Sequence, residues 1–103
     1  VPGTNPEELI VAAHAACYNM ALAGQLAQKG YKPQHIETHA TCFLTPQPAG
    51  GFRITRMHLQ VRAQVPNIEP TAFHQVVEEA DKGCPVSNLL RNGLEIEIDA
   101  DLQ

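Results

Sequence analysis

The sequence contains few cysteines, no cluster of basic residues and no long uninterrupted apolar run. Three cysteines are an odd number and a low density, which argues against a secreted disulfide scaffold. The net charge is -4 at pH 7 and the seven Lys and Arg residues are scattered, so we expect no nucleic-acid partner. The longest apolar run, Leu9 to Ala13, is well short of the roughly 20 residues of a membrane span.

The start of the chain also lacks recognisable signals. Residues 1–5, VPGTN, contain no initiator Met, and neither a basic segment nor a cleavage site marks a signal peptide around the apolar run. We therefore expect a cytoplasmic protein without a membrane span, and we expect further residues to precede Val1. With 103 residues and 44% apolar composition, residues 1–103 are expected to form a single domain.

A long helix is predicted near the start of the chain. Thr4 or Asn5 can cap it, and Pro6 suits its first helical position. Helix-forming residues dominate from Leu9 to Ala27, and Lys29-Gly30 provides a stop signal. The first half is apolar around almost its whole circumference, so we expect this helix to be central and covered on several sides.

Apolar and polar residues alternate in three segments, which predicts three β-strands. The strands are expected over Gln34–Thr45, Phe52–Val65 and Leu94–Leu102. Turn-forming residues 46–51 predict a hairpin between the first two strands. Phe52 and Ile54 are out of phase with the inward-facing residues that follow, which predicts either a β-bulge or burial on both faces near the start of the second strand.

Two further helices are predicted between the second and third strands. Apolar residues at helical spacing from Ala72 predict an amphipathic helix that ends at Gly83. A short helix follows Pro85 and ends near Asn92-Gly93. The order helix, strand, strand, helix, strand predicts an α+β fold, with the long helix packed on a mainly antiparallel sheet.

The cysteines are the first candidates for chemistry. Cys17 lies in the apolar helix, where a thiol is commonly a small core residue. His14 shares its helical face and would lower the thiol pKa if the imidazole were charged, whereas a core histidine would not. Cys84 precedes the short helix, whose N–H groups suit a thiolate, although it also fits a plain turn residue. Cys42 is expected to be a core residue.

Other catalytic signatures are not recognisable. His39 and Cys42 are near each other in sequence, but positions three apart on a strand point to opposite faces, so we expect no metal site. The glycine-rich phosphate and dinucleotide motifs, the zinc-protease helix motif and the serine-nucleophile motif are all missing. No cofactor is therefore expected.

Two longer motifs make the strongest prediction. Residues 4–22, TNPEELIVAAHAACYNMAL, look very like the signature helix of the OsmC/Ohr family of thiol-dependent peroxidases. Residues 82–87, KGCPVS, resemble the second cysteine motif of that family. The separation of the two motifs and the order of elements between them are typical of the family. His14 and Ser87 look closer to the OsmC branch than to the Ohr branch.

The resemblance implies a mechanism and partners. Cys17 would attack an organic hydroperoxide or hydrogen peroxide and become a sulfenic acid. Cys84 would then react with the sulfenic acid to form a Cys17–Cys84 disulfide. An external dithiol would reduce that disulfide; in the Ohr branch the donor is a dihydrolipoyl group on a carrier protein. The resemblance further implies a homodimer that acts in oxidative and osmotic stress defence.

Activation of the thiol also follows from the resemblance. The resemblance implies that N-terminal strands of the domain precede Val1. It also implies an arginine N-terminal to the signature helix, held by a glutamate that matches Glu7, and residues 1–103 do not include this arginine. About ten positions separate Glu7 from Cys17, or about 15 Å along a helix. Either the arginine bridges this gap or Glu7 reaches the active site of a second subunit, and the dimer favours the second hypothesis. Glu7 also suits simple pairing with the helix dipole.

Two other functions stay open at this point. The first is a catalytically incompetent OsmC-like binding or scaffold domain, which fits the missing arginine. The second is a thiol enzyme that acts on disulfides or electrophiles. The separation of the Cys17 and Cys84 sulfurs tests the first alternative, and peroxide consumption tests the second.

Overall fold

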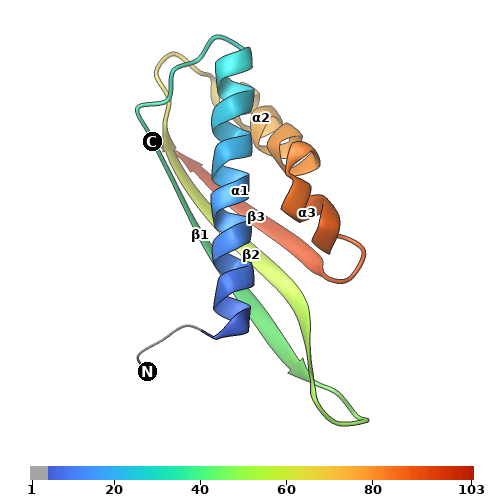
Figure 1. Cartoon of the computed structure of the whole chain (residues 1–103). Coiled ribbons are helices and arrows are strands. Elements are labelled where there is room, and N and C mark those ends of the chain that lie inside the picture. Colours follow the sequence, from blue (N-terminus) through green and yellow to red (C-terminus); the bar gives the residue numbers. More distant parts are fainter. Residues whose placement is uncertain (1–4) are drawn as a thin grey trace.

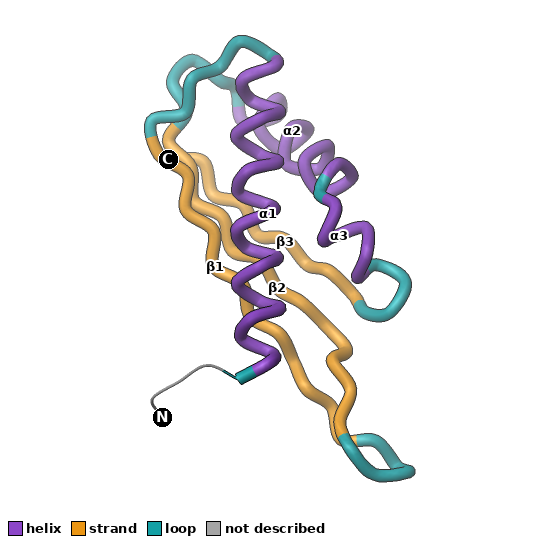
Figure 2. The backbone as a smooth tube through the Cα atoms, in the orientation of Figure 1, coloured by secondary structure: helices purple, strands orange, loops and turns teal. Residues whose placement is uncertain are grey.

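Helices cover one face of a three-stranded sheet in the computed structural model, which describes residues 5–103 (Figure 1). The elements are, in order, α1 Pro6–Gln28, β1 His35–Pro46, β2 Phe52–Gln64, α2 Pro70–Gly83, α3 Pro85–Leu90 and β3 Glu95–Leu102. Figure 2 shows the β1–β2 hairpin extending past the first turn of α1, which gives the molecule an elongated shape of 51 × 31 × 19 Å. The predicted α+β class is confirmed.

The ends of α1 follow the signals in the sequence. The side chain of Asn5 accepts a hydrogen bond of 2.8 Å from the backbone N–H of Glu8, and Pro6 occupies the first turn. Thr4, the other predicted cap, lies outside the described residues. Lys29 is the C-cap, and Gly30 adopts a positive φ of 88° that only glycine enters without strain.

One side of α1 carries its packing. The four fully buried residues of the helix recur at every fourth position: His14, Tyr18, Leu22 and Leu26. On the rest of the surface Leu9 is 62% exposed and Met20 is 75% exposed. The prediction that several sides of α1 are covered is therefore wrong for the single chain, because the sheet, α2 and α3 all contact one side of the helix.

The sheet is mixed, with the strand order β1-β2-β3. β1 and β2 form the predicted antiparallel hairpin, and the predicted bulge is present, since Thr55 has no partner between the Phe43–Arg56 and Leu44–Ile54 pairs. β3 pairs with β2 in parallel. The prediction of an antiparallel sheet is thus wrong for β3, because α2 and α3 form a crossover that returns the chain to the end of the sheet where β2 began.

The core lies between the sheet and the helices. Alternate residues of β2 are fully buried, as the period of a strand requires: Met57, Leu59, Val61 and Ala63. α2 adds Phe73, Val76 and Ala80 at helical spacing. Burial of each large side chain contributes about 1.5–3 kcal/mol, so this layer fixes the position of α1 against α2.

By length and composition alone, α1 would suffice to cross a membrane, and it lies near the N-terminus of residues 1–103. The sequence predicted no span because no uninterrupted apolar run in this segment is long enough, whereas the mean hydropathy along the helix is high. Core helices of water-soluble proteins pass the same test, and here Tyr18, Leu22 and Leu26 belong to the domain core.

Candidate active site

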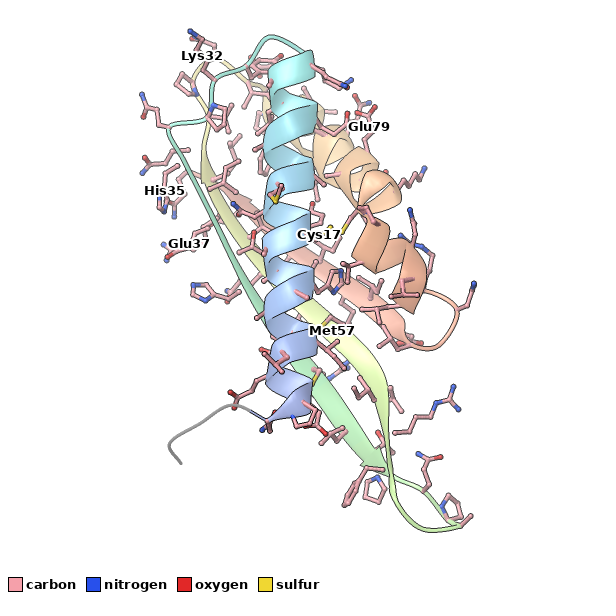
Figure 3. The ribbon with its side chains drawn as sticks, viewed as in Figure 1. Cys17, Lys32, His35, Glu37, Met57 and Glu79 are labelled. Carbon is pink, nitrogen blue, oxygen red and sulfur yellow. The ribbon has the colours of Figure 1, made fainter. Side chains whose placement is uncertain are left out.

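The structure brings Cys17 and Cys84 together. Cys17 is half-buried at the middle of α1, on the side that faces α3 (Figure 3). Cys84 is fully buried in the junction between α2 and α3. The side chain of Cys84 is a hydrogen-bonding neighbour of the Cys17 thiol, and both thiols are free. Two residues from separate sequence motifs therefore share one site.

Cys84 is held by the backbone on both sides. Its own N–H bonds to the carbonyl of Asp81 at 3.3 Å, which ends α2. Its Sγ accepts a hydrogen bond of 3.4 Å from the N–H of Ser87, which makes Cys84 the N-cap of α3. The sequence placed Cys84 next to an N-cap; the structure makes its sulfur the capping atom.

The surroundings of Cys17 disfavour the thiolate. Burial raises the pKa of the Cys17 thiol above its ordinary value, and the neighbouring thiol of Cys84 raises it further. A hydrogen bond from the backbone of Val86 opposes both effects and lowers the pKa. Among the described residues, no lysine or arginine contributes to this balance. A reactive thiolate at Cys17 needs an added positive charge.

His14 does not supply that charge. Its ring is fully buried, and burial lowers the pKa of His14 more than the nearby carboxylate of Asp81 raises it. Burial therefore favours the neutral imidazole, whose Nε2 shares a hydrogen bond of 2.7 Å with Oγ of Ser87, which is also fully buried. Of the two roles open for His14, the core histidine is confirmed, although its Nδ1 has no partner among the described residues.

Two polar contacts hold α2 in place. The hydroxyl of Tyr18 donates to the backbone carbonyl of Val77 at 2.9 Å, which ties α1 to α2. Asp81, in the last turn of α2, accepts a hydrogen bond of 2.9 Å from Nη1 of Arg91. Desolvation raises the pKa of Tyr18 well above its ordinary range, so its hydroxyl keeps the proton that it donates.

Sequence reasoning missed two parts of the site. It did not assign contacts to Ser87, whose hydroxyl and backbone N–H bond to His14 and Cys84 respectively. It also missed the backbone of Val86 as a partner of Cys17. The KGCPVS motif contains both residues, and Ser87 lies three positions after a capping residue, where the first free N–H groups of a helix point back to the cap.

Glu7 lies apart from Cys17 and Cys84 within the chain. It lines a groove of about 390 Å³ between the start of α1 and β1, together with Thr41, Cys42 and Leu44. Cys17 is not among the residues of this groove. Cys42 is half-buried rather than fully buried as a core residue, and it faces this groove.

The described part of the chain contains no group of three or more His, Cys, Asp or Glu side chains that could hold a metal ion. Nε2 of His39 instead lies 3.7 Å from Oε1 of Glu37, on the exposed part of β1.

Comparisons with known proteins agree with this site. The family model described as "OsmC-like protein" matches residues 2–99. Peroxiredoxin OsmC of Escherichia coli is 45% identical over 101 residues, which are 98% of this chain and 68% of that protein. The organic hydroperoxide resistance protein of Xanthomonas axonopodis is 32% identical over 95 residues, which are 91% of this chain and 64% of that protein.

Solved structures share the fold. The crystal structure of an OsmC-like protein from Mycoplasma pneumoniae superposes with a TM-score of 0.87 at 21% identity and covers 99% of this chain and 74% of that chain. The family model and the sequence relatives span nearly all of the residues described above, including both cysteine motifs. The chain belongs to the OsmC-like family.

Proposed function

We propose that the protein is a cysteine-based peroxidase that reduces organic hydroperoxides and also hydrogen peroxide. The observation that carries this proposal is the pairing of two free thiols, Cys17 and Cys84, from the two family motifs. Relatives at 45% and 32% identity are named peroxiredoxin OsmC and organic hydroperoxide resistance protein, which supports the same chemistry. Defence against oxidative and osmotic stress and a cytoplasmic location remain predictions.

In the proposed reaction the Cys17 thiolate attacks the terminal oxygen of the hydroperoxide. The O–O bond breaks, the alcohol leaves with a proton, and Cys17 becomes a sulfenic acid. The sulfur of Cys84 then attacks the sulfur of Cys17, the S–O bond breaks, and water leaves with the proton of Cys84. A dithiol reduces the disulfide by two exchange steps, and we propose a dihydrolipoyl group on a carrier protein as donor.

The proposed chemistry needs a cation close to Cys17. Burial and the neighbouring thiol of Cys84 both raise the pKa of Cys17, and no described lysine or arginine offsets them. We propose that an arginine outside residues 5–103, from the N-terminal part of the domain, supplies this charge. The same observation favours a second function, an OsmC-like binding or scaffold domain whose thiols do not react.

A homodimer fits the surface of the single chain. Leu9 and Met20 are 62% and 75% exposed on α1, and Leu89 is 78% exposed on α3. Exposed large apolar residues favour a protein interface over free surface. Because Glu7 lies in a groove that includes neither Cys17 nor Cys84 of its own chain, we propose that it acts at the active site of the partner subunit.

Peroxide consumption tests the proposed function directly. The protein is supplied with dihydrolipoamide as the dithiol, and loss of cumene hydroperoxide and of hydrogen peroxide is followed for the wild type and for Cys17→Ser. We expect turnover by the wild type, none by Cys17→Ser, and unchanged turnover by the matched control Cys42→Ser. No turnover of either peroxide by the wild type supports the unreactive domain instead.

A further inference from the structure

His14 and Ser87 form an unusual pair in this chain. They are the two fully buried polar or charged residues among those described, and they bond to each other at 2.7 Å. His14 lies three positions before Cys17 on α1, and Ser87 lies three positions after Cys84 at the start of α3. Each member of the bond is therefore a near neighbour of one cysteine.

A contribution to stability does not by itself explain this buried hydrogen bond. Burying an imidazole and a hydroxyl requires that each keeps a hydrogen-bond partner, and an apolar pair of the same size would meet no such requirement. One ring nitrogen of His14, Nδ1, is buried without a described partner, so the pair is incompletely satisfied. What the bond does provide is a directional link between α1 and α3, which hydrophobic contact does not give.

Ser87 also bonds to Cys84. Its side chain bonds to His14 on α1, while its backbone N–H bonds to Sγ of Cys84 at 3.4 Å. The backbone of Val86, next to Ser87, lies close enough to Cys17 to lower its pKa. The first turn of α3 thus approaches the Cys17 thiol and is bonded to α1 at His14.

Among the described residues, the other contacts of α3 do not provide a second side-chain hydrogen bond to α1: the Asn88 amide donates to the Lys82 carbonyl on α2 at 2.9 Å, and Val86 and Leu90 pack against the core. The helix comprises the six residues Pro85–Leu90, and Leu89 is 78% exposed. A disulfide demands a specific separation and torsion of the two sulfur atoms, so small shifts of α3 against α1 matter for its formation.

We propose that the His14–Ser87 hydrogen bond positions Cys84 for disulfide formation with Cys17. This inference rests on the proposed peroxidase function and assigns both residues as positioning residues for its second step. In that step the sulfur of Cys84 displaces the hydroxyl of the Cys17 sulfenic acid as water. When α3 is poorly placed, a second peroxide oxidises the sulfenic acid to sulfinic acid before Cys84 arrives.

The test measures how oxidised Cys17 divides between disulfide and sulfinic acid. The protein is treated with increasing cumene hydroperoxide, and the two products are counted by mass spectrometry of the intact protein. Ser87→Ala and His14→Leu are each expected to lower the ratio of disulfide to sulfinic acid by about tenfold or more. His14→Gln, whose amide can reach Ser87 as Nε2 does, is expected to restore most of the ratio.

Tyr18→Phe is the matched control, because it removes another buried hydrogen bond from α1, the one to Val77 on α2. It is expected to leave the ratio unchanged. The double variant His14→Leu with Ser87→Ala is expected to match each single variant, because all three remove the same hydrogen bond between residues 14 and 87. An unchanged ratio in Ser87→Ala, or an equal loss in Tyr18→Phe, would overturn the proposal. If Ser87→Ala does not fold, the comparison of His14→Gln with His14→Leu decides.

A second measurement separates this proposal from the proposed function. The Cys17–Cys84 dithiol is equilibrated with glutathione buffers, which reports the effective concentration of one thiol at the other without any peroxide. Ser87→Ala is expected to shift this equilibrium towards the dithiol by about tenfold. If the wild type is inert to peroxide but Ser87→Ala still shifts the thiol–disulfide equilibrium, the peroxidase function is refuted and the positioning role is kept. Equal equilibria in both proteins refute the positioning role.

Discussion

The thiol of Cys84 is a direct neighbour of the thiol of Cys17 and raises its pKa. Removing this neighbour in Cys84→Ala takes away a raising influence, so the pKa of Cys17 is expected to fall. The rate of alkylation of Cys17 by iodoacetamide, measured against pH in residues 1–103, reports this pKa because the thiolate is the nucleophile. The midpoint of the profile should lie at lower pH in Cys84→Ala than in the wild type.

Cys42→Ala is the control for this measurement. Cys42 lies in the groove at the start of α1 and does not contribute to the pKa of Cys17. Its removal should leave the alkylation midpoint where it is in the wild type. Coinciding profiles for the wild type and Cys84→Ala would show that Cys84 does not raise the pKa of Cys17.

Local signals in the sequence predicted most of the fold. Asn5, Pro6 and Gly30 define the ends of α1 because capping and backbone conformation depend on near neighbours. Alternation along β2 predicted its buried face for the same reason. The direction of β3 was predicted wrongly, since an alternating pattern is the same for parallel and antiparallel pairing and only the crossover through α2 and α3 decides it.

The candidate site shows the same division between local and long-range information. The two cysteine motifs were recognised from sequence, and the structure brings Cys17 and Cys84 together. The partnership of His14 with Ser87 was missed, because residues 73 positions apart meet only when α3 packs on α1. A buried serine in a short helix has no periodic signature that distinguishes it from an exposed one.

Buried His14 is expected to make the domain less stable in mild acid. Its pKa is lowered by burial in the folded chain, so the unfolded chain binds a proton more readily. Its contribution to stability is complete above the ordinary value of 6.5 and is lost as the pH falls below that value, by at most about 1.4 kcal/mol per pH unit. The charges that face the ring, Asp81 and Arg91, oppose each other.

Urea unfolding at about pH 7.5 and about pH 5.5 measures this effect, and His14→Gln is the comparison because glutamine does not titrate. The wild type should lose stability between these two conditions, and the loss should be smaller in His14→Gln. An equal loss in both proteins would assign the acid sensitivity to other groups.

Arg91 is expected to matter for stability more than an ordinary surface residue. Nη1 of Arg91 bonds to Oδ2 of Asp81 at 2.9 Å, and Nη2 bonds to the backbone carbonyl of Asp81 at 3.1 Å. The Asp81 side chain is only 17% exposed, so Arg91→Ala leaves a poorly solvated carboxylate and should lower the free energy of unfolding by about 1–3 kcal/mol.

Glu79→Ala is the control for Arg91→Ala, since it breaks the Lys29–Glu79 ion pair, whose side chains are 43% and 46% exposed. An exposed pair contributes about 0–1 kcal/mol, so the stability in urea should change little. Equal losses in the two variants would contradict a special role for the partly buried Asp81–Arg91 pair.

Glu7 is predicted to serve the active site of the partner subunit, and mixed dimers can test this. Homodimers of Glu7→Gln and of Cys17→Ser are both expected to be impaired in peroxide turnover. In a mixed dimer of these two variants, one site combines an intact Cys17 with an intact Glu7 from the other chain. That dimer should therefore recover about half of the wild-type activity per dimer.

If Glu7 acts within its own chain, the mixed dimer behaves differently. The chain with an intact Cys17 then carries Glu7→Gln, so neither site is complete and no activity is recovered on mixing. Glu8→Gln is the matched control, because Glu8 lies in the same first turn, its backbone N–H donates to the Asn5 cap at 2.8 Å, and its carboxylate accepts only a long hydrogen bond of 3.5 Å from the Asn5 amide. The helix dipole favours a carboxylate at either position to a similar degree, so a loss confined to Glu7→Gln separates catalysis from helix stability.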